Sequence, residues 1–140
     1  MYLREMPHPS QLVDVFFDLD RTLWDFDRNS REALEEIFLE IAQPALPEVR
    51  TADEFIPVYE EENEKCWKAY REGQLTKEQL RPLRFRNAMR GLGIAEFAGM
   101  DALAEQMGTA YVERAPYRTA LFDGAQEVCA TLKNRGHRLF

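Results

Sequence analysis

An almost unbroken apolar run near the N-terminus constrains the fold of this 140-residue chain more than any other feature. Residues 12–19 read LVDVFFDL, and Asp14 is the one polar interruption before Asp18. Strands with apolar residues on both faces are typical of parallel sheets that helices cover on both sides. The run therefore predicts a buried parallel strand and an α/β fold, with the chain turning at Asp18-Leu19-Asp20.

The rest of the sequence predicts helices, marked by capping residues at their starts and by glycine or proline at their ends. Five helices are expected. The first runs from Asn29, with Glu32 as its capping partner, and ends at Pro44 and Pro47. The other four run from Thr51 to Gly73, from Thr76 to about Arg90, from Asp101 to Glu113 and from Gly124 to Arg135. Pro82 predicts a later start for the third helix. Residues 137–140 then predict the opening of a second strand.

One strand and the opening of another are too little for a sheet, because unpaired backbone groups in a buried strand are costly. We therefore expect the sequence to be the N-terminal part of a longer protein. Residues 1–26 would form the first core strand and its loop, residues 27–115 a helical insertion, and residues 116–140 the return to the core. The alternative is a mostly helical domain with one isolated strand.

Composition excludes several classes of partner. The formal charge is −7, from 18 basic and 25 acidic residues, which argues against binding to a nucleic-acid polymer. No apolar run approaches the roughly 20 residues that span a bilayer, and residues 1–10 do not resemble a signal peptide. Cys66 and Cys129 lie in no metal-binding or CxxC spacing, which favours buried free thiols. A cytoplasmic protein without membrane contact is expected.

Asp18 and Asp20 lie two residues apart where the predicted strand ends. In an extended backbone such side chains point to the same side, while Leu19 would turn back toward the core. Two neighbouring carboxylates repel each other unless a cation intervenes, and Mg²⁺ takes oxygen ligands. One carboxylate can then attack phosphorus while the other transfers protons. The hydroxyl of Thr22 would hold either the loop or a phosphate oxygen.

Residues 16–23, FFDLDRTL, resemble the first motif of the haloacid dehalogenase superfamily, a hydrophobic strand followed by DxDxT. The resemblance implies that Asp18 forms an aspartyl-phosphate and binds Mg²⁺. It implies that Asp20 is the general acid and base, and that its backbone carbonyl also ligates the metal. An Asp at the second position resembles the phosphatases rather than the dehalogenases, and it leaves phosphatase and phosphomutase activity both open.

A weaker similarity to bacterial pyrimidine 5′-nucleotidases of this superfamily covers residues 18–30, 80–89 and 121–140. It implies a Rossmann-like core, incomplete in this sequence, with an inserted helical cap that makes the chain mostly helical. Asp123 stands where the family usually has Pro. The phosphate-binding Thr or Ser, the Lys and the further acidic pair that follow in the family are absent. The resemblance implies a Mg²⁺-dependent phosphate monoester hydrolase, with nucleoside 5′-monophosphates as the expected substrates. The 140-residue chain alone is expected to be inactive or nearly so.

Three further residues are candidates for substrate contact: Trp24, Arg84 and Arg86. Packing of the loop is an equally good interpretation of Trp24. The arginines belong to a basic concentration at positions 81, 84, 86 and 90. These would either pair with Glu60, Glu61, Glu62 and Glu64 on the neighbouring helix or place Arg84 or Arg86 against the leaving group. Four aromatic residues would be core or stack on a nucleobase: Tyr59, Trp67, Tyr70 and Tyr111.

Other functions stay open at this point. A sugar-phosphate phosphatase or a phosphomutase would use the same two aspartates on another small phosphorylated metabolite. A non-catalytic phospho-acceptor module, similar to response-regulator receivers, also uses an Asp at a strand end with Mg²⁺, but receivers lack a long helical insertion after that strand. A purely helical interaction protein is the third alternative. Self-association through exposed apolar sheet edges would be compatible with any of them.

Overall fold

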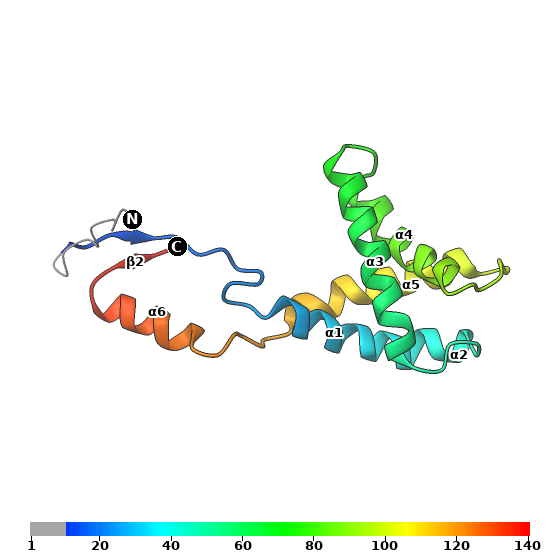
Figure 1. The fold of residues 1–140 in the computed structure, drawn as a ribbon, viewed down its shortest axis with the longest axis horizontal. Helices are drawn as coiled ribbons and strands as arrows, with labels where there is room; N and C mark the ends of the chain where they lie inside the picture. Colours follow the sequence, from blue (N-terminus) through cyan, green and yellow to red (C-terminus); the bar gives the residue numbers. More distant parts are fainter. Residues whose placement is uncertain (1–10) are drawn as a thin grey trace, which may run out of the picture. The chain divides into compact units, whose positions relative to one another are not determined.

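The computed structural model describes residues 11–140, which are mostly helical with one small parallel sheet (Figure 1). The predicted predominance of helix is confirmed. The chain divides into two compact units, the first made of the chain up to Asp27 together with Thr119–Phe140, and the second of Arg28–Arg118. Residues 1–10, where no signal peptide is predicted, lie outside the described residues. Within the described part, no helix is both long and apolar enough to cross a bilayer.

The first unit contains the sheet. Strand β1 (Asp14–Val15) pairs in parallel with β2 (Arg138–Leu139), which follows helix α6 (Ala125–Asn134). The pairing continues past both strands, because the amide of Phe140 donates to the carbonyl of Val15 at 2.9 Å and the amide of Phe17 donates to the carbonyl of Phe140 at 2.8 Å. The second predicted strand is therefore confirmed in a short form. The expectation that the two segments could not form a sheet is wrong.

The apolar residues of the first strand are not buried as predicted. Leu12 is 67% exposed and Phe16 is 76% exposed. Phe16 stacks on Phe140 with ring centroids 5.0 Å apart, and Phe140 is itself 59% exposed. The prediction of a strand covered on both faces is wrong for the described residues, because this unit supplies β1 with one neighbouring strand and one helix. That is too little surface to cover two faces.

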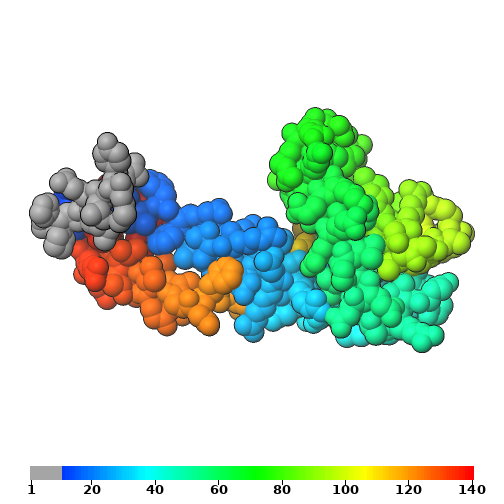
Figure 2. All heavy atoms as spheres, viewed as in Figure 1, coloured from blue at the N-terminus to red at the C-terminus, as the bar shows by residue number. Residues whose placement is uncertain are grey.

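The second unit is a set of packed helices, which begins within α1. The elements are α1 (Phe26–Ile37), a π-helical turn (Phe38–Ala42), α2 (Gln43–Ala45), α3 (Ala52–Arg71), α4 (Lys77–Gly91), α5 (Met100–Arg114) and a 3₁₀ turn (Ala115–Tyr117). Figure 2 shows the side chains of α3 (green) packed directly against those of α4 (yellow-green). The five predicted helices are thus confirmed, with different boundaries at the first.

Two of the predicted helix N-terminal caps are present in the structure, and one is not. The side chain of Thr51 accepts the amide of Glu54 at 3.2 Å, and Thr76 forms a reciprocal capping box with Gln79, as predicted. Pro82 does not delay the third helix, because it lies early in α4 and removes only one backbone hydrogen bond. The capping role predicted for Asn29 is wrong: α1 begins three residues earlier, and Asn29 is fully buried inside it.

The hydrophobic core of the second unit is built around aromatic rings. Tyr59 and Phe85 lie 4.6 Å apart between ring centroids, and Phe55 packs on both. Gly108 brings α5 close to α4, since a Cβ at this position would lie 2.9 Å from the carbonyl oxygen of Arg81. Other buried core residues are Leu34, Ile37, Phe38, Ala42, Leu46, Ile56, Ala88, Met89, Met100, Ala104 and Met107.

The two cysteines are free thiols in different environments. Cys66 is buried, as predicted, and burial raises the pKa of its thiol above the usual value. Cys129, on α6, is only half-buried. The prediction that both are buried is therefore confirmed for Cys66 and wrong for Cys129, because the described residues cover the surface of α6 less completely than that of α3.

Candidate functional site

The loop after β1 is organised by a single backbone carbonyl. The carbonyl oxygen of Leu19 accepts hydrogen bonds from the amides of Thr22 (3.3 Å), Leu23 (3.1 Å) and Trp24 (2.9 Å). Arg21, at the apex, has a φ of 59° and donates its amide to the carbonyl of Trp24 at 3.0 Å. A residue other than glycine seldom adopts this left-handed conformation, and such residues cluster at functional sites.

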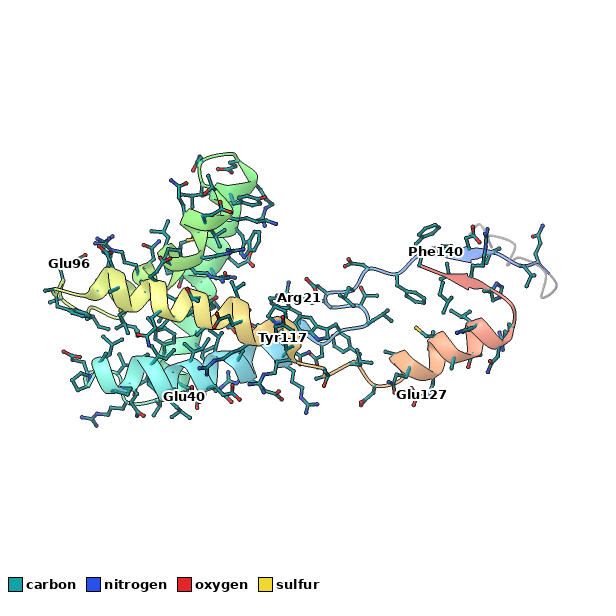
Figure 3. The ribbon with its side chains drawn as sticks, turned by 180° about the vertical axis from the view of Figure 1, so that it is seen from behind. Arg21, Glu40, Glu96, Tyr117, Glu127 and Phe140 are labelled. Carbon is teal, nitrogen blue, oxygen red and sulfur yellow. The ribbon has the colours of Figure 1, made fainter. Side chains whose placement is uncertain are left out.

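Side-chain contacts hold Arg21 in this conformation. Its Nε donates to Oδ1 of Asp27 at 3.0 Å, and its guanidinium carbon lies 4.7 Å from the ring centroid of Phe26. The indole of Trp24 meets the same ring edge-on, at 5.9 Å between centroids. Figure 3 labels Arg21 in this loop. These contacts tie the loop to the first turn of α1 and offset the cost of the backbone conformation.

Asp18, Asp20 and Thr22 are all exposed in this loop. The two carboxylates and the Thr22 hydroxyl make no hydrogen bond or ion pair with residues 11–140, and the backbone carbonyl of Asp20 accepts no hydrogen bond from them. Of the two uses predicted for the Thr22 hydroxyl, holding the loop is thus not observed. The prediction that Leu19 turns toward the core is wrong, since Leu19 is 59% exposed and contributes its carbonyl to the turn instead.

The oxygen atoms of this loop suit a magnesium ion by their chemistry. Residues 11–140 contain no cluster of three or more His, Cys, Asp or Glu side chains that could hold a metal. Mg²⁺ does not need one, because it is commonly bound by one or two carboxylates, with water and substrate phosphate completing the octahedron. The carboxylates of Asp18 and Asp20 and the backbone carbonyl of Asp20 are donors of this kind.

The returning segment of the first unit supports the loop from the other side. The amide of Asp25 donates to the carbonyl of Ala120 at 3.0 Å, and the amide of Phe122 donates to the carbonyl of Leu23 at 3.1 Å. Trp24 is half-buried and forms a bridge with Leu121. Its position favours the packing interpretation, and contact of Trp24 with a substrate stays a prediction.

Arg86 and Arg90 are neutralised by acidic residues beyond the end of their own helix. Both pair with Glu96, with the Arg86 Nη2 to Oε2 distance at 3.3 Å and the Arg90 Nε to Oε1 distance at 2.7 Å. Arg86 also pairs with Asp101. The expected pairing of these arginines with the glutamates at positions 60, 61, 62 and 64 is wrong. Within α3, Glu61 and Glu62 pair with Lys65 instead. The sequence offered no signal for this choice of partner.

Arg84 lies in a different environment from its neighbours on α4. It is 5% exposed, and its guanidinium donates to the side-chain oxygen of Asn63 at 3.0 Å and to the backbone carbonyl of Arg81 at 3.3 Å. The guanidinium carbon lies 4.6 Å from the ring centroid of Tyr111. None of the ion pairs among residues 11–140 includes Arg84. Sequence reasoning selected Arg84 but missed its burial and the role of Asn63.

The aromatic residues near Arg84 are mainly structural. Tyr59 is 2% exposed, and burial raises the pKa of its hydroxyl far above the usual value. That hydroxyl has no hydrogen-bond partner among the described residues. The hydroxyl of Tyr111 forms a 2.8 Å hydrogen bond with Ser30. For Tyr59 the core interpretation is therefore confirmed.

Comparisons with known proteins add no relative, because no family model matches this sequence and no curated protein matches it.

Proposed function

We propose that this chain supplies the nucleophile and the general acid of a phosphate monoester hydrolase of the haloacid dehalogenase superfamily. Asp18 attacks phosphorus, the bond to the leaving alcohol breaks, and an aspartyl-phosphate forms. Asp20 gives its proton to the departing oxygen and later takes one from the water that hydrolyses the aspartyl-phosphate. A bound Mg²⁺ would neutralise charge on the phosphate oxygens.

One observation carries this proposal more than any other. Two exposed carboxylates lie two residues apart in the loop that follows the parallel strand β1, without any partner among residues 11–140, and the same loop holds Arg21 in a left-handed conformation. Structural aspartates in turns usually accept hydrogen bonds from nearby backbone amides. Asp18 and Asp20 accept none, which leaves their oxygens available to a cation and to a substrate.

The helices of the second unit would then act as a cap that excludes water and selects the leaving group, on a Rossmann-like core that begins with β1. The substrate we propose is a small phosphorylated metabolite, a nucleoside 5′-monophosphate. The protein would act on it in the cytoplasm. Of the candidate cap residues, Arg84 keeps a charge that no carboxylate neutralises, whereas Arg86 is paired with Glu96 and Asp101. Arg84 is therefore the better candidate for contact with the substrate.

The 140-residue chain alone would turn over little or no substrate. Stabilising the charge on a transferring phosphoryl group depends on several positioned donors and a fully held metal. The resemblance implies a phosphate-binding hydroxyl, a lysine and a further acidic pair after the second strand, and this sequence contains none of them in that place. The nucleophile and the acid are present without this support.

The test is phosphate release from a panel of nucleoside monophosphates and sugar phosphates, with Mg²⁺ or with EDTA. The assay uses the 140-residue chain and, where the natural reading frame continues past Phe140, the longer product. We expect Mg²⁺-dependent release by the longer product, at least 10³-fold lower in Asp18→Asn because the nucleophile is lost, and almost none by the short chain. Release by the short chain that Asp18→Asn leaves unchanged would contradict the proposal.

The same experiment separates the alternatives. A preference for sugar phosphates, or isomerised rather than hydrolysed product, would favour a sugar-phosphate phosphatase or a phosphomutase. Stable labelling of Asp18 by acetyl phosphate without any release from monoesters would favour a phospho-acceptor module instead.

A further inference from the structure

We propose that Arg84 is the centre of a binding site for a small oxyanion, a carboxylate or a phosphate group, on the helices of the second unit. The site involves α3, α4 and α5. It goes beyond the hydrolase proposed above and would stand whether or not Asp18 is a nucleophile.

The charge of Arg84 is buried and has no acidic partner among residues 11–140. Arg84 is 5% exposed, and burial of a guanidinium without a carboxylate or phosphate partner is unfavourable. Its neighbours on the same helix, Arg86 and Arg90, are less buried and yet both pair with carboxylates. Arg84 is thus the most buried arginine of α4, and no acidic residue among residues 11–140 neutralises it. Arg81 also has no ion pair with the described residues, but it is exposed to solvent, which hydrates its charge.

The side chains around Arg84 offer more hydrogen-bond donors than acceptors. Arg84 uses Nη1 and Nε for neutral acceptors, the side-chain oxygen of Asn63 and the carbonyl of Arg81, and its Nη2 makes no hydrogen bond to the described residues. The amide nitrogen of Asn63 likewise has no acceptor among them, and the buried hydroxyl of Tyr59 has no partner. An oxyanion would satisfy a guanidinium and an amide together, because its oxygens only accept.

Three aromatic rings surround the guanidinium of Arg84. Its carbon lies 4.6 Å from the ring centroid of Tyr111, 5.6 Å from that of Phe85 and 5.7 Å from that of Tyr59. Aromatic faces stabilise a buried cation in part and fix the plane of its fork, which suits a planar or bidentate anion. Tyr111 and Asn63 are only half-buried, so the guanidinium lies just beneath the surface of the second unit.

A purely structural role for Arg84 makes the opposite prediction about stability. If its packing and hydrogen bonds hold the helices together, Arg84→Met must lower the melting temperature. If Arg84 is kept for an anion, replacing the uncompensated charge with an apolar side chain of similar length leaves the melting temperature unchanged or raises it.

The experiment is thermal unfolding of the 140-residue chain, followed by circular dichroism in chloride buffer at constant ionic strength. Sodium phosphate and sodium acetate are added in separate arms, which distinguishes a phosphate site from a carboxylate site. An anion at about tenfold its dissociation constant should raise the melting temperature of the wild type by roughly 4 °C. The shift should be lost in Arg84→Met and kept in Arg90→Met, an exposed arginine on the same helix.

A second variant tests the site without removing the arginine. Asn63→Asp places a carboxylate where an amide oxygen now accepts from Arg84 at 3.0 Å. We expect this built-in anion to raise the melting temperature in chloride and to abolish the response to phosphate and acetate. Equal anion responses in the wild type and Arg84→Met, no response in the wild type, a lower melting temperature of Arg84→Met in chloride, or an unchanged response in Asn63→Asp would each overturn the proposal.

Discussion

The guanidinium of Arg21 donates to the carboxylate of Asp27 at 3.0 Å, so the residue between the two motif positions Asp20 and Thr22 is fastened to the first turn of α1. This contact and the stacking of Arg21 on Phe26 hold a backbone conformation with a φ of 59°. The geometry of the loop therefore depends on a side chain that takes no part in the proposed chemistry.

Arg21→Ala should destabilise the first unit, because it removes the ion pair and the cation–π contact but keeps the left-handed conformation. We expect the free energy of unfolding to fall by about 1 kcal/mol. The measurement is urea denaturation followed by the fluorescence of Trp24 in a Trp67→Phe background. Arg21→Gly is the matched variant: it loses the same contacts but relieves a conformational cost of roughly 1 kcal/mol, so its loss should be smaller. A larger loss in Arg21→Gly would contradict this account of the turn.

Gly108→Ala should destabilise the second unit although alanine is the better helix former. Its Cβ would lie 2.9 Å from the carbonyl oxygen of Arg81, and this backbone atom cannot move without shifting α4. Overpacking of this kind costs about 1–3 kcal/mol, against a gain in helix propensity of about 1 kcal/mol.

Thr109→Ala, at the exposed neighbouring position of α5, is the control for this prediction. It adds no atom to the structure, and alanine has the higher helix propensity. We expect the midpoint of urea denaturation to fall for Gly108→Ala and to stay the same or rise for Thr109→Ala. A Gly108→Ala midpoint equal to that of the wild type would show that α4 and α5 are not packed as closely as described.

Thr76→Ala should lower the free energy of unfolding by about 1 kcal/mol, because it removes the side-chain acceptor for the amide of Gln79. Thr109, an exposed residue within α5, provides the comparison. Thr109→Ala should be neutral or slightly stabilising, since alanine has the higher helix propensity. Chemical denaturation of both variants measures the difference, and a Thr76→Ala variant as stable as the wild type would mean that the cap is not formed in solution.

Tyr59→Phe should leave the stability at neutral pH unchanged or higher, since it removes a buried hydroxyl that lacks a hydrogen-bond partner. Burial raises the pKa of Tyr59, so at alkaline pH the unfolded chain ionises before the folded chain does. The stability contributed by the neutral phenol is complete below the unfolded pKa of about 10 and is lost as the pH rises above it.

Unfolding free energies of the wild type and Tyr59→Phe, measured between pH 8 and pH 11, test this linkage. The wild type should lose more stability above about pH 10 than the variant. Cys66, whose pKa burial also raises, remains in both proteins and cancels in the comparison. Parallel pH curves for the two proteins would argue against a buried Tyr59.

Features that depend on neighbouring residues could be predicted from the sequence. The capping box of Thr76 and Gln79 needs only residues three apart, and the buried stripe of Leu34, Ile37 and Phe38 follows from helical spacing. The sequence predicts that residues 137–140 open a second strand, but it does not predict that this strand pairs with β1. The pairing joins residues more than 120 positions apart in the sequence.

Features that depend on packing between distant segments could not be predicted. Asn29 is a residue type that often caps helices, but in the structure it lies inside α1 and is fully buried. The apolar pattern of residues 12–19 predicts a strand that is buried on both faces. Burial requires other strands and helices to pack on those faces, and in the described residues Phe16 stays exposed. The isolation of Arg84 from acidic residues likewise depends on how α3, α4 and α5 meet.

The most direct test of the central claim is a search for the metal at Asp18 and Asp20 by nuclear magnetic resonance. Amide signals of the ¹⁵N-labelled chain are followed during titration with MgCl₂, and trace Mn²⁺ then broadens the signals nearest to the bound ion. We expect shifts and broadening concentrated at residues 18–24 and abolished in the Asp18→Asn, Asp20→Asn double variant. Broadening spread over the glutamates of α3, or unchanged in the double variant, would contradict the claim that these two carboxylates hold one divalent ion.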